Sequence, residues 1–215
     1  MNDLQSVLCH TSLKMKYKNI DFFDFLDQKE KKAQFYPKLI LEMSEYSHYD
    51  REKALILAEV SQLLFYSLEI HEKISCPQYP KTEVILAGDY LYSQIFKIIT
   101  TRNFEELIPF FTTFIKEFSA KRILFFDGEM ESEELLRFKY VRPAEIAARV
   151  ITKDNPEMLQ VASDLSDLFY LHMTDAADVD MRRQLLLKEK KDTVSAAVFS
   201  VIRNTVPFTG DNDNE

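Results

Sequence analysis

Apolar residues recur every three or four positions along most of this chain, which is the spacing of helices that bury one face. The period-two alternation of half-buried strands is not sustained anywhere in the sequence. The spacing predicts helices over residues 4–16, 32–47, 51–74, 82–101, 104–118, 119–126, 132–138, 143–150, 156–178 and 181–203, with a helical turn near 19–26. We therefore expect an all-α protein of roughly eight to ten antiparallel helices. Residues 1–207 are expected to form one domain, followed by a disordered polar tail at 208–215.

Capping residues and prolines set several of the predicted helix boundaries. Asp50 and Asn103 are each expected to be the N-cap of the helix that follows, because their side chains can accept hydrogen bonds from free backbone N–H groups. Pro77 and Pro80 are expected to end the helix that begins at residue 51. Pro143 is expected in the first turn of a new helix, where the missing N–H of proline costs nothing.

The helix predicted over residues 82–101 contains a glycine and an aspartate side by side. Gly88 lies on the same apolar stripe as Val84 and Leu91. Glycine inside a helix costs about 1 kcal/mol relative to alanine, so we expect another helix to approach this backbone closely. A carboxylate beside a core is costly unless it is paired, so Asp89 is expected to be a structural polar group.

Composition and charge exclude several classes of protein. Only three glycines and seven prolines in 215 residues favour a helical fold over folds with many tight turns. The net charge of −8 argues against a nucleic-acid-binding protein. No run reaches the roughly 18 apolar residues of a membrane span, and the first residues lack the pattern of a signal peptide. With two cysteines expected as free thiols, Cys9 and Cys76, a cytoplasmic location is predicted.

Three acidic segments are candidates for chemistry, and each has a plainer interpretation. The two carboxylates and the histidine at 69–72 can bind a metal or a proton, or can form a solvated helix end. Asp175 and Asp178 share one helix face and can hold Mg²⁺ when a substrate phosphate supplies further oxygens, or can end a helix. Asp127-Gly128-Glu129 is most simply a turn. The basic cluster at 182–191 can meet a diphosphate or form a solvated face.

Four segments, taken in order, resemble motifs of the trans-polyprenyl diphosphate synthase superfamily. Leu86-Ala87-Gly88-Asp89 matches its L-A-G-D helix, Gly128-Glu129 its G-E pair, Arg142-Pro143-Ala144 its K-T-A segment, and 169–178 the end of its F-Q-x-x-D-D-x-x-D helix. The order and approximate spacing hold over roughly residues 50–205. The resemblance implies an isoprenoid-synthase-like antiparallel helical bundle, complete or truncated. It also implies that Gly88, Asp89, Gly128 and Glu129 are structural motif residues.

The sequence departs from this superfamily at both metal-binding motifs. The D-D-x-x-D motif before L-A-G-D is replaced by Ser67-Leu68-Glu69-Ile70-His71-Glu72-Lys73, and the paired arginine is absent. The second motif keeps Asp175 and Asp178 but has Thr174 in place of its leading aspartate. Ionisation of an allylic diphosphate needs several Mg²⁺ ions held by carboxylates on two facing helices. We therefore expect no catalytic residue and no cofactor in this chain alone, with Asp175 and Asp178 as its only metal candidates.

The pattern S-L-x-x-H-[DE]-K before L-A-G-D-Y is similar to the small subunit, component I, of heterodimeric heptaprenyl diphosphate synthases. This resemblance implies a noncatalytic regulatory subunit in menaquinone side-chain synthesis. Its partner would be the catalytic large subunit, component II, which binds Mg²⁺ and isoprenoid diphosphates. The resemblance also implies a partner-binding face around Gly88 and residues 104–118. Aromatic residues that can line a product tunnel, an interface or simply the core are Tyr90, Phe110, Phe111 and Phe114.

Two other functions stay open at this point. The chain can be a divergent prenyltransferase or terpene-type enzyme that acts alone through Asp175 and Asp178. It can also be a noncatalytic helical protein that binds an isoprenoid. Turnover by the purified chain would favour the first, and lipid that co-purifies with a stable monomer would favour the second.

Overall fold

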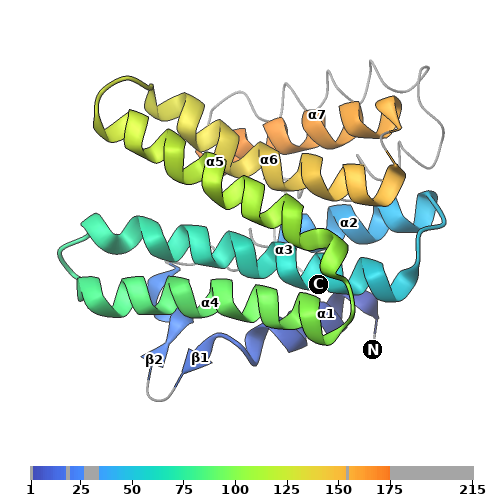
Figure 1. The fold of residues 1–215 in the computed structure, drawn as a ribbon, viewed down its shortest axis with the longest axis horizontal. Helices are drawn as coiled ribbons and strands as arrows, with labels where there is room; N and C mark the ends of the chain where they lie inside the picture. The colour runs from blue at the N-terminus through green and yellow to red at the C-terminus, as the bar shows by residue number, and fades with distance from the viewer. Residues whose placement is uncertain (1, 18–19, 27–33, 154, 175–215) are drawn as a thin grey trace, which may run out of the picture. The chain divides into compact units, whose positions relative to one another are not determined.

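The computed structural model describes residues 2–17, 20–26, 34–153 and 155–174 (Figure 1). Its elements are α1 (Asp3–Ser12), β1 (Lys16–Tyr17), β2 (Ile20–Asp21), η1 (Phe22–Phe25), α2 (Phe35–Tyr46), α3 (Arg51–Glu72), η3 (Lys73–Ser75), α4 (Lys81–Thr101), η4 (Glu105–Leu107), α5 (Ile108–Phe126), α6 (Ser132–Thr152) and α7 (Pro156–Met173). The predicted all-α class is confirmed. The sequence pattern missed one feature, the antiparallel pairing of β1 with β2, because two residues are too few to show alternation.

The chain divides into two compact units. The first comprises Met1–Pro37 and Asp50–Phe111, and the second comprises Lys38–Tyr49 and Thr112–Glu215. The segment Asp50–Phe111 is therefore inserted in the sequence between the two parts of the second unit. The single domain over residues 1–207 and the polar tail at 208–215 stay predictions. The helix predicted over 181–203 lies outside the described residues.

The first unit is built around α3. Asp50 begins this helix as predicted, because its Oδ1 accepts a hydrogen bond of 2.8 Å from the backbone N–H of Lys53. Burial is not confined to one stripe, since almost every side chain from Ala54 to Ile70 is buried. Both α1 and α4 pack against α3, and α4 runs beside it for most of its length (Figure 1). The helix is therefore a core element with little surface of its own.

The same helix accounts for the one segment that resembles a membrane span among the described residues. Arg51–Ser75 is long enough, and its most apolar window has a mean hydropathy of 1.2. However, 89% of that window is buried inside the protein. Burial of this extent is what a central core helix shows.

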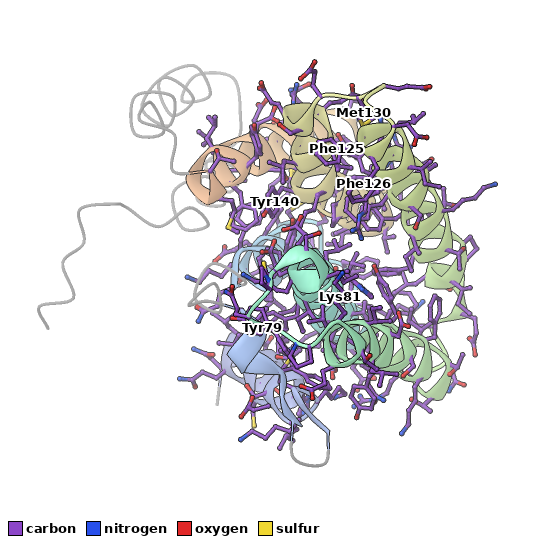
Figure 2. All side chains as sticks on the ribbon, turned by 90° about the vertical axis from the view of Figure 1, so that its left-hand side faces the viewer. Tyr79, Lys81, Phe125, Phe126, Met130 and Tyr140 are labelled. Atoms are coloured by element: carbon purple, nitrogen blue, oxygen red, sulfur yellow. The ribbon has the colours of Figure 1, made fainter. Side chains whose placement is uncertain are left out.

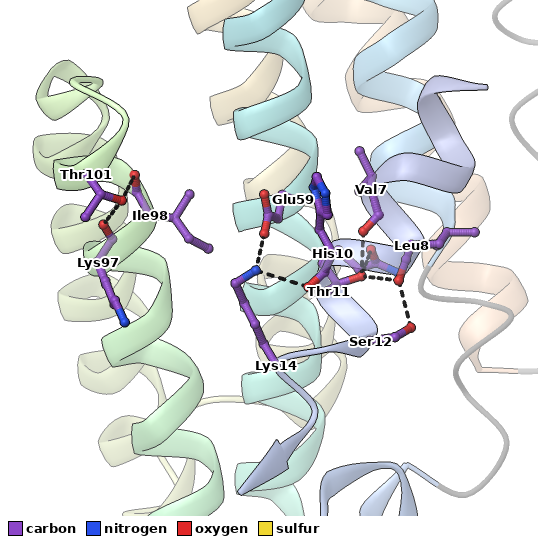
Figure 3. Close-up of polar contacts among 11 residues, drawn as sticks. Val7, Leu8, His10, Thr11, Ser12, Lys14, Glu59, Lys97, Ile98 and Thr101 are labelled. Atoms are coloured by element: carbon purple, nitrogen blue, oxygen red, sulfur yellow. Dashed lines mark hydrogen bonds and ion pairs between the residues drawn. The ribbon is translucent and has the colours of Figure 1, made fainter. Parts of the chain in front are cut away.

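A buried polar network joins α1 to α3 (Figure 3). The Nζ of Lys14, just after α1, donates to Oε1 of Glu59 at 2.6 Å, and only 6% of the Glu59 side chain is exposed. The hydroxyl of Thr11 lies 2.8 Å from Oε1 of Gln62, whose amide in turn donates to the hydroxyl of Tyr66 at 3.0 Å. Buried polar groups are stable only when they are hydrogen-bonded in this way. The network therefore fixes where α1 lies along α3.

The predicted boundaries between α4 and α5 are wrong. Asn103 does not cap a new helix but ends α4 with φ of 55°, while the N–H of Phe104 donates to the carbonyl of Ile99 at 2.9 Å. This is a Schellman ending, in which a residue in the left-handed conformation satisfies the last free carbonyls. After the turn η4, the helix restarts at Ile108. It then continues without a break to Phe126, because no residue near Ser119 interrupts its geometry.

In the second unit, α6 also differs from the prediction. It is one helix with Pro143 inside it, not two helices separated before Pro143. Proline in a helix interior removes a hydrogen bond and costs about 3 kcal/mol. Pro143 and its neighbours Ala144 and Ala147 are buried, and α6 packs on α7, whose predicted apolar stripe from Met158 to Phe169 is confirmed as buried. Two 2.9 Å hydrogen bonds from the Arg137 guanidinium to the Asp167 carboxylate also tie α6 to α7.

Candidate functional site

Gly88 lies where the last turns of α3 pack on α4, within the first unit. The imidazole of His71 covers it so closely that a Cβ on Gly88 would lie 2.4 Å from Nε2 of His71. The hydroxyl of Ser67, one turn earlier on α3, donates a hydrogen bond of 3.0 Å to the Gly88 carbonyl. The close approach expected here is therefore made by a side chain and not by the backbone of another helix. Glycine is needed because the ring of His71 occupies the space of a Cβ.

Asp89 lies beside the buried stripe of α4 and not within it, and its role as a structural polar group stays a prediction. Its side chain is 63% exposed, because it projects from the side of α4 next to the buried stripe. The His71 side chain is only 13% exposed, and its Nε2 lies 3.4 Å from Oδ1 of Asp89. The imidazole also stacks on the ring of Tyr92, with centroids 5.4 Å apart. His71 is thus held between Gly88, Tyr92 and the carboxylate at the surface.

The segment that replaces the first aspartate-rich motif is used for packing. Ser67 and Glu69 are buried, at 0% and 1% exposure, while His71 and Glu72 are half-buried. The interpretation of residues 69–72 as a solvated helix end is therefore wrong for Glu69. Within the described part of the chain, no three His, Cys, Asp or Glu side chains come together in a group that could hold a metal ion.

The segment Asp127-Gly128-Glu129 forms the turn after α5. Gly128 has φ of 75°, and its N–H donates to the Phe125 carbonyl at 3.1 Å. The N–H of Glu129 donates to the Leu124 carbonyl at 2.8 Å, which completes a second Schellman ending. Glu129 is exposed. Gly128 has a structural role in this turn, which agrees with the interpretation of residues 127–129 as a simple turn.

Gly128→Ala is expected to lower the free energy of unfolding by about 1 kcal/mol, because only glycine adopts this conformation without strain. A Cβ at this position would meet no atom within 4 Å, so the backbone alone accounts for the loss. Denaturant unfolding of the two proteins would measure the difference. Ser119→Ala, at an exposed position of the same helix, is the control and should change stability by less than about 0.5 kcal/mol. Equal stability of Gly128→Ala and the parent would contradict this role.

The segment that resembles K-T-A lies in the middle of α6. Nη1 of Arg142 donates to Oε2 of Glu145 at 3.0 Å, and its Nε lies 3.7 Å from Oε2 of Glu117. Sequence reasoning missed its neighbour Lys139, which is 1% exposed and whose Nζ donates to the Tyr140 hydroxyl at 3.3 Å. Lys139 lies one helical turn before the buried Pro143, and this spacing was the signal that could have predicted the burial of Lys139.

The four aromatic candidates occupy different environments. Tyr90 is half-buried and meets Phe22 edge-on, with ring centroids 5.5 Å apart. Phe111 and Phe114 are buried, at 2% and 0% exposure, whereas Phe110 is 38% exposed. The assignment of these residues to a product tunnel or to a partner interface stays a prediction. Burial makes core packing the simplest role for Phe111 and Phe114.

The second aspartate-rich segment is described only up to Thr174, so Asp175, Asp178 and the basic cluster at 182–191 lie outside the described residues. Tyr170 lies one turn before Thr174. Desolvation by burial, with a smaller contribution from the charge of Glu133, raises the pKa of Tyr170, while Arg137 acts in the opposite direction. The neutral phenol is therefore the form that α7 presents here at ordinary pH.

Three solved structures resemble this chain over nearly its whole length. A deletion mutant of the mint heterotetrameric geranyl pyrophosphate synthase gives a TM-score of 0.60 at 13% identity, covering 93% of this chain and 96% of that one. Geranyltranstransferase from Thermotoga maritima gives 0.59 at 15% identity, with coverage of 93% and 94%. A decaprenyl diphosphate synthase from Rhodobacter capsulatus gives 0.58 at 12% identity, with coverage of 94% and 80%.

No model of a protein family and no curated protein matches the sequence. At 12–15% identity, the structural similarity establishes the fold and not the activity. The expected architecture is nevertheless confirmed: the chain has the helical-bundle fold of isoprenoid synthases, as these prenyl diphosphate synthases do.

Proposed function

We propose that this protein is the noncatalytic small subunit of a heterodimeric long-chain prenyl diphosphate synthase. Its partner is a catalytic large subunit that condenses isopentenyl diphosphate onto an allylic diphosphate and holds the Mg²⁺ ions. The small subunit stabilises that partner and contributes to product length. A heptaprenyl product for menaquinone and a cytoplasmic location follow from the sequence resemblance and belong to the same proposal.

One observation carries this proposal. In the segment that replaces the first aspartate-rich motif, Ser67 and His71 both contact Gly88, and Glu69 is buried. Mg²⁺ that holds the oxygens of a diphosphate needs carboxylates open to the ligand, whereas Ser67 and His71 pack α3 against α4 and the Glu69 carboxylate is closed to solvent. The protein thus has the fold of a prenyl diphosphate synthase, but the segment in place of its first metal-binding motif is packed inside the protein. This combination favours a supporting subunit over an enzyme that acts alone.

The outer face of α4 is the surface proposed to bind the catalytic subunit. Leu86 is 60% exposed and Ile85 is 41% exposed, although both belong to a helix whose other face is buried. Exposed apolar side chains that adjoin each other are typical of protein–protein contacts. The similar mint enzyme is heterotetrameric, which shows that this fold occurs in enzymes built from more than one kind of chain.

The proposal is tested by assaying the purified chain and a complete two-motif synthase from the same source, separately and mixed, with Mg²⁺ and both diphosphates. We expect no product from this chain alone, and a several-fold rise in activity or a longer product on mixing. Leu86→Asp should weaken binding of the catalytic subunit at least about tenfold, because it buries an unpaired charge. Leu13→Asp, at an exposed apolar position just after α1, is the matched control.

Two results would overturn this function. Mg²⁺-dependent turnover by the single chain, abolished by Asp175→Asn or Asp178→Asn, would make it an enzyme in its own right. A mixture with unchanged activity and unchanged product length would remove the regulatory role, and an isoprenoid that co-purifies with the lone chain would then identify a binding protein.

A further inference from the structure

The outer face of α4 carries one charge in the middle of an otherwise uncharged stretch. Within residues 84–96, Asp89 is the only residue with a charged side chain. It lies one turn after the exposed Ile85 and Leu86, on the side of α4 away from its buried stripe. Figure 2 views this helix from the end at which it begins, near Lys81. A partner that covers the exposed apolar side chains therefore also covers a carboxylate.

Asp89 has no lysine or arginine at its carboxylate among the described residues. Its ion-pair contact is with His71, whose Nε2 lies 3.4 Å from Oδ1 of Asp89, and this pair is charged only when the imidazole is protonated. The ring of His71 is packed over Gly88 and stacks on Tyr92, so it stays behind the carboxylate. The Asp89 side chain is 63% exposed, so the other side of the carboxylate is open to an external group.

Covering this carboxylate with apolar surface would oppose binding. An ionised carboxylate that loses its water needs a cation or hydrogen-bond donors in return. A guanidinium suits this position best, because its planar array of N–H groups binds both oxygens of one carboxylate and it is less strongly hydrated than an ammonium. The surface that covers Asp89 is therefore expected to supply an arginine.

The same charge selects against a second copy of this helix. Two copies of α4 that cross at residue 89 would bring two carboxylates together, and such like-charge contacts exclude wrong partners. Residues 84–96 contain no cation that could pair with either of them. The face therefore favours a chain of different sequence, as the catalytic subunit is.

We propose that Asp89 binds an arginine of the catalytic subunit when that subunit covers the outer face of α4. This contact rests on the proposed function and adds the chemistry by which the partner is selected. Ile85 and Leu86 supply apolar contact area, which many proteins could match. The pair between Asp89 and the arginine decides which chain is accepted, because only a partner with a cation at this point compensates the buried carboxylate.

Asp89→Asn tests the contact, because it removes the charge with little change of shape. Titration of the full-length chain with the purified catalytic synthase of the same source would measure the dissociation constant. The constant should rise at least about tenfold, since the arginine is left unpaired in the interface. Glu83→Gln, at an exposed position in the first turn of the same helix, is the matched control and should change it by less than about twofold.

Two further measurements separate a lost contact from a loss of folding. Asp89→Asn and the parent should unfold at the same denaturant concentration, because the Asp89 side chain is mostly exposed in the lone chain. Added salt should raise the dissociation constant of the parent more steeply than that of Asp89→Asn, because only the parent complex contains this charge pair.

Substitutions in the catalytic subunit identify the other half of the pair. Each arginine of that subunit is replaced by methionine in turn, and one replacement should weaken binding about as much as Asp89→Asn does. Combining it with Asp89→Asn should weaken binding no further. Asp89→Arg should weaken binding more than Asp89→Asn, and an arginine-to-glutamate change at the same partner residue should restore part of the affinity.

The outcomes distinguish this contact from the function on which it rests. Equal binding by the parent and Asp89→Asn would overturn the contact and leave the proposed function standing, as would partner arginines that all act independently of Asp89. Failure of both the parent and Glu83→Gln to bind the synthase would overturn the proposed function and this contact with it. Weaker binding by an Asp89→Asn protein that also unfolds at a lower denaturant concentration would show a structural residue and not a binding residue.

Discussion

Phe114→Ala is expected to lower the free energy of unfolding by about 3–5 kcal/mol, the usual cost of removing a fully buried phenylalanine. Phe114 is completely buried and stacks between Phe118 and Phe138, with centroids 5.9 and 5.8 Å apart and ring planes within 6° of parallel. Truncation leaves a cavity between two rings carried by α5 and α6. Denaturant unfolding of the full-length chain would measure the loss.

Phe110→Ala is the matched control, one helical turn earlier. Its side chain is 38% exposed, so the substitution should cost less than about 1 kcal/mol. Similar costs at the two positions would show that Phe114 is not a core residue. A product of altered length with stability unchanged, measured in complex with a catalytic subunit, would instead place Phe114 in a product tunnel.

Gly88→Ala is expected to lower the free energy of unfolding by about 2 kcal/mol, within the range for an overpacked core. The new Cβ would lie 2.4 Å from Nε2 and 2.6 Å from two carbons of the His71 ring, which is also held by its stacking on Tyr92. Alanine has the better helix propensity by about 1 kcal/mol, but this gain is smaller than the cost of moving the ring. Thermal or denaturant unfolding would measure the net change.

The effect should reverse in sign when the ring is absent. In a His71→Ala background, Gly88→Ala should raise stability by about 1 kcal/mol, because only the helix propensity remains. The four proteins form a double-mutant cycle, and its coupling energy reports the contact between residues 71 and 88 directly. A loss of stability in both backgrounds would mean that Gly88 is needed by something other than His71.

The helices that the sequence predicted well are those with clear ends and one regular stripe. For α3, the cap at Asp50 and the proline after the helix defined its extent, and the regular stripe of α7 defined its buried face. The predictions failed at residues whose local preferences allow two structures, because tertiary packing decides between them. Pro143 is tolerated inside α6 because the surrounding segment is buried. Asn103 has the preferences of both a helix start and a left-handed helix end, and only the structure shows which applies.

The site was predicted less completely than the fold. Periodicity placed Gly88 on the buried stripe of α4 but could not identify what covers it, since His71 belongs to another helix. One residue along a helix turns the side chain by about 100°, so the carboxylate of Asp89 lies at the surface although its neighbour Gly88 is buried, and its predicted structural role is untested. The burial of Lys139 was missed because a lysine is ordinarily assumed to be exposed.

The insertion of Asp50–Phe111 between the two parts of the second unit has a consequence for synthesis of the protein. The part of α2 that belongs to the second unit, from Lys38 onward, is synthesised before α3 and α4, whereas the remainder of that unit is synthesised last. The inserted segment contains α3 and α4, which contact each other through residues close in the sequence and can pair early. The buried side chains of α2, such as Met43, must wait for α5 to α7 to emerge before their unit can close.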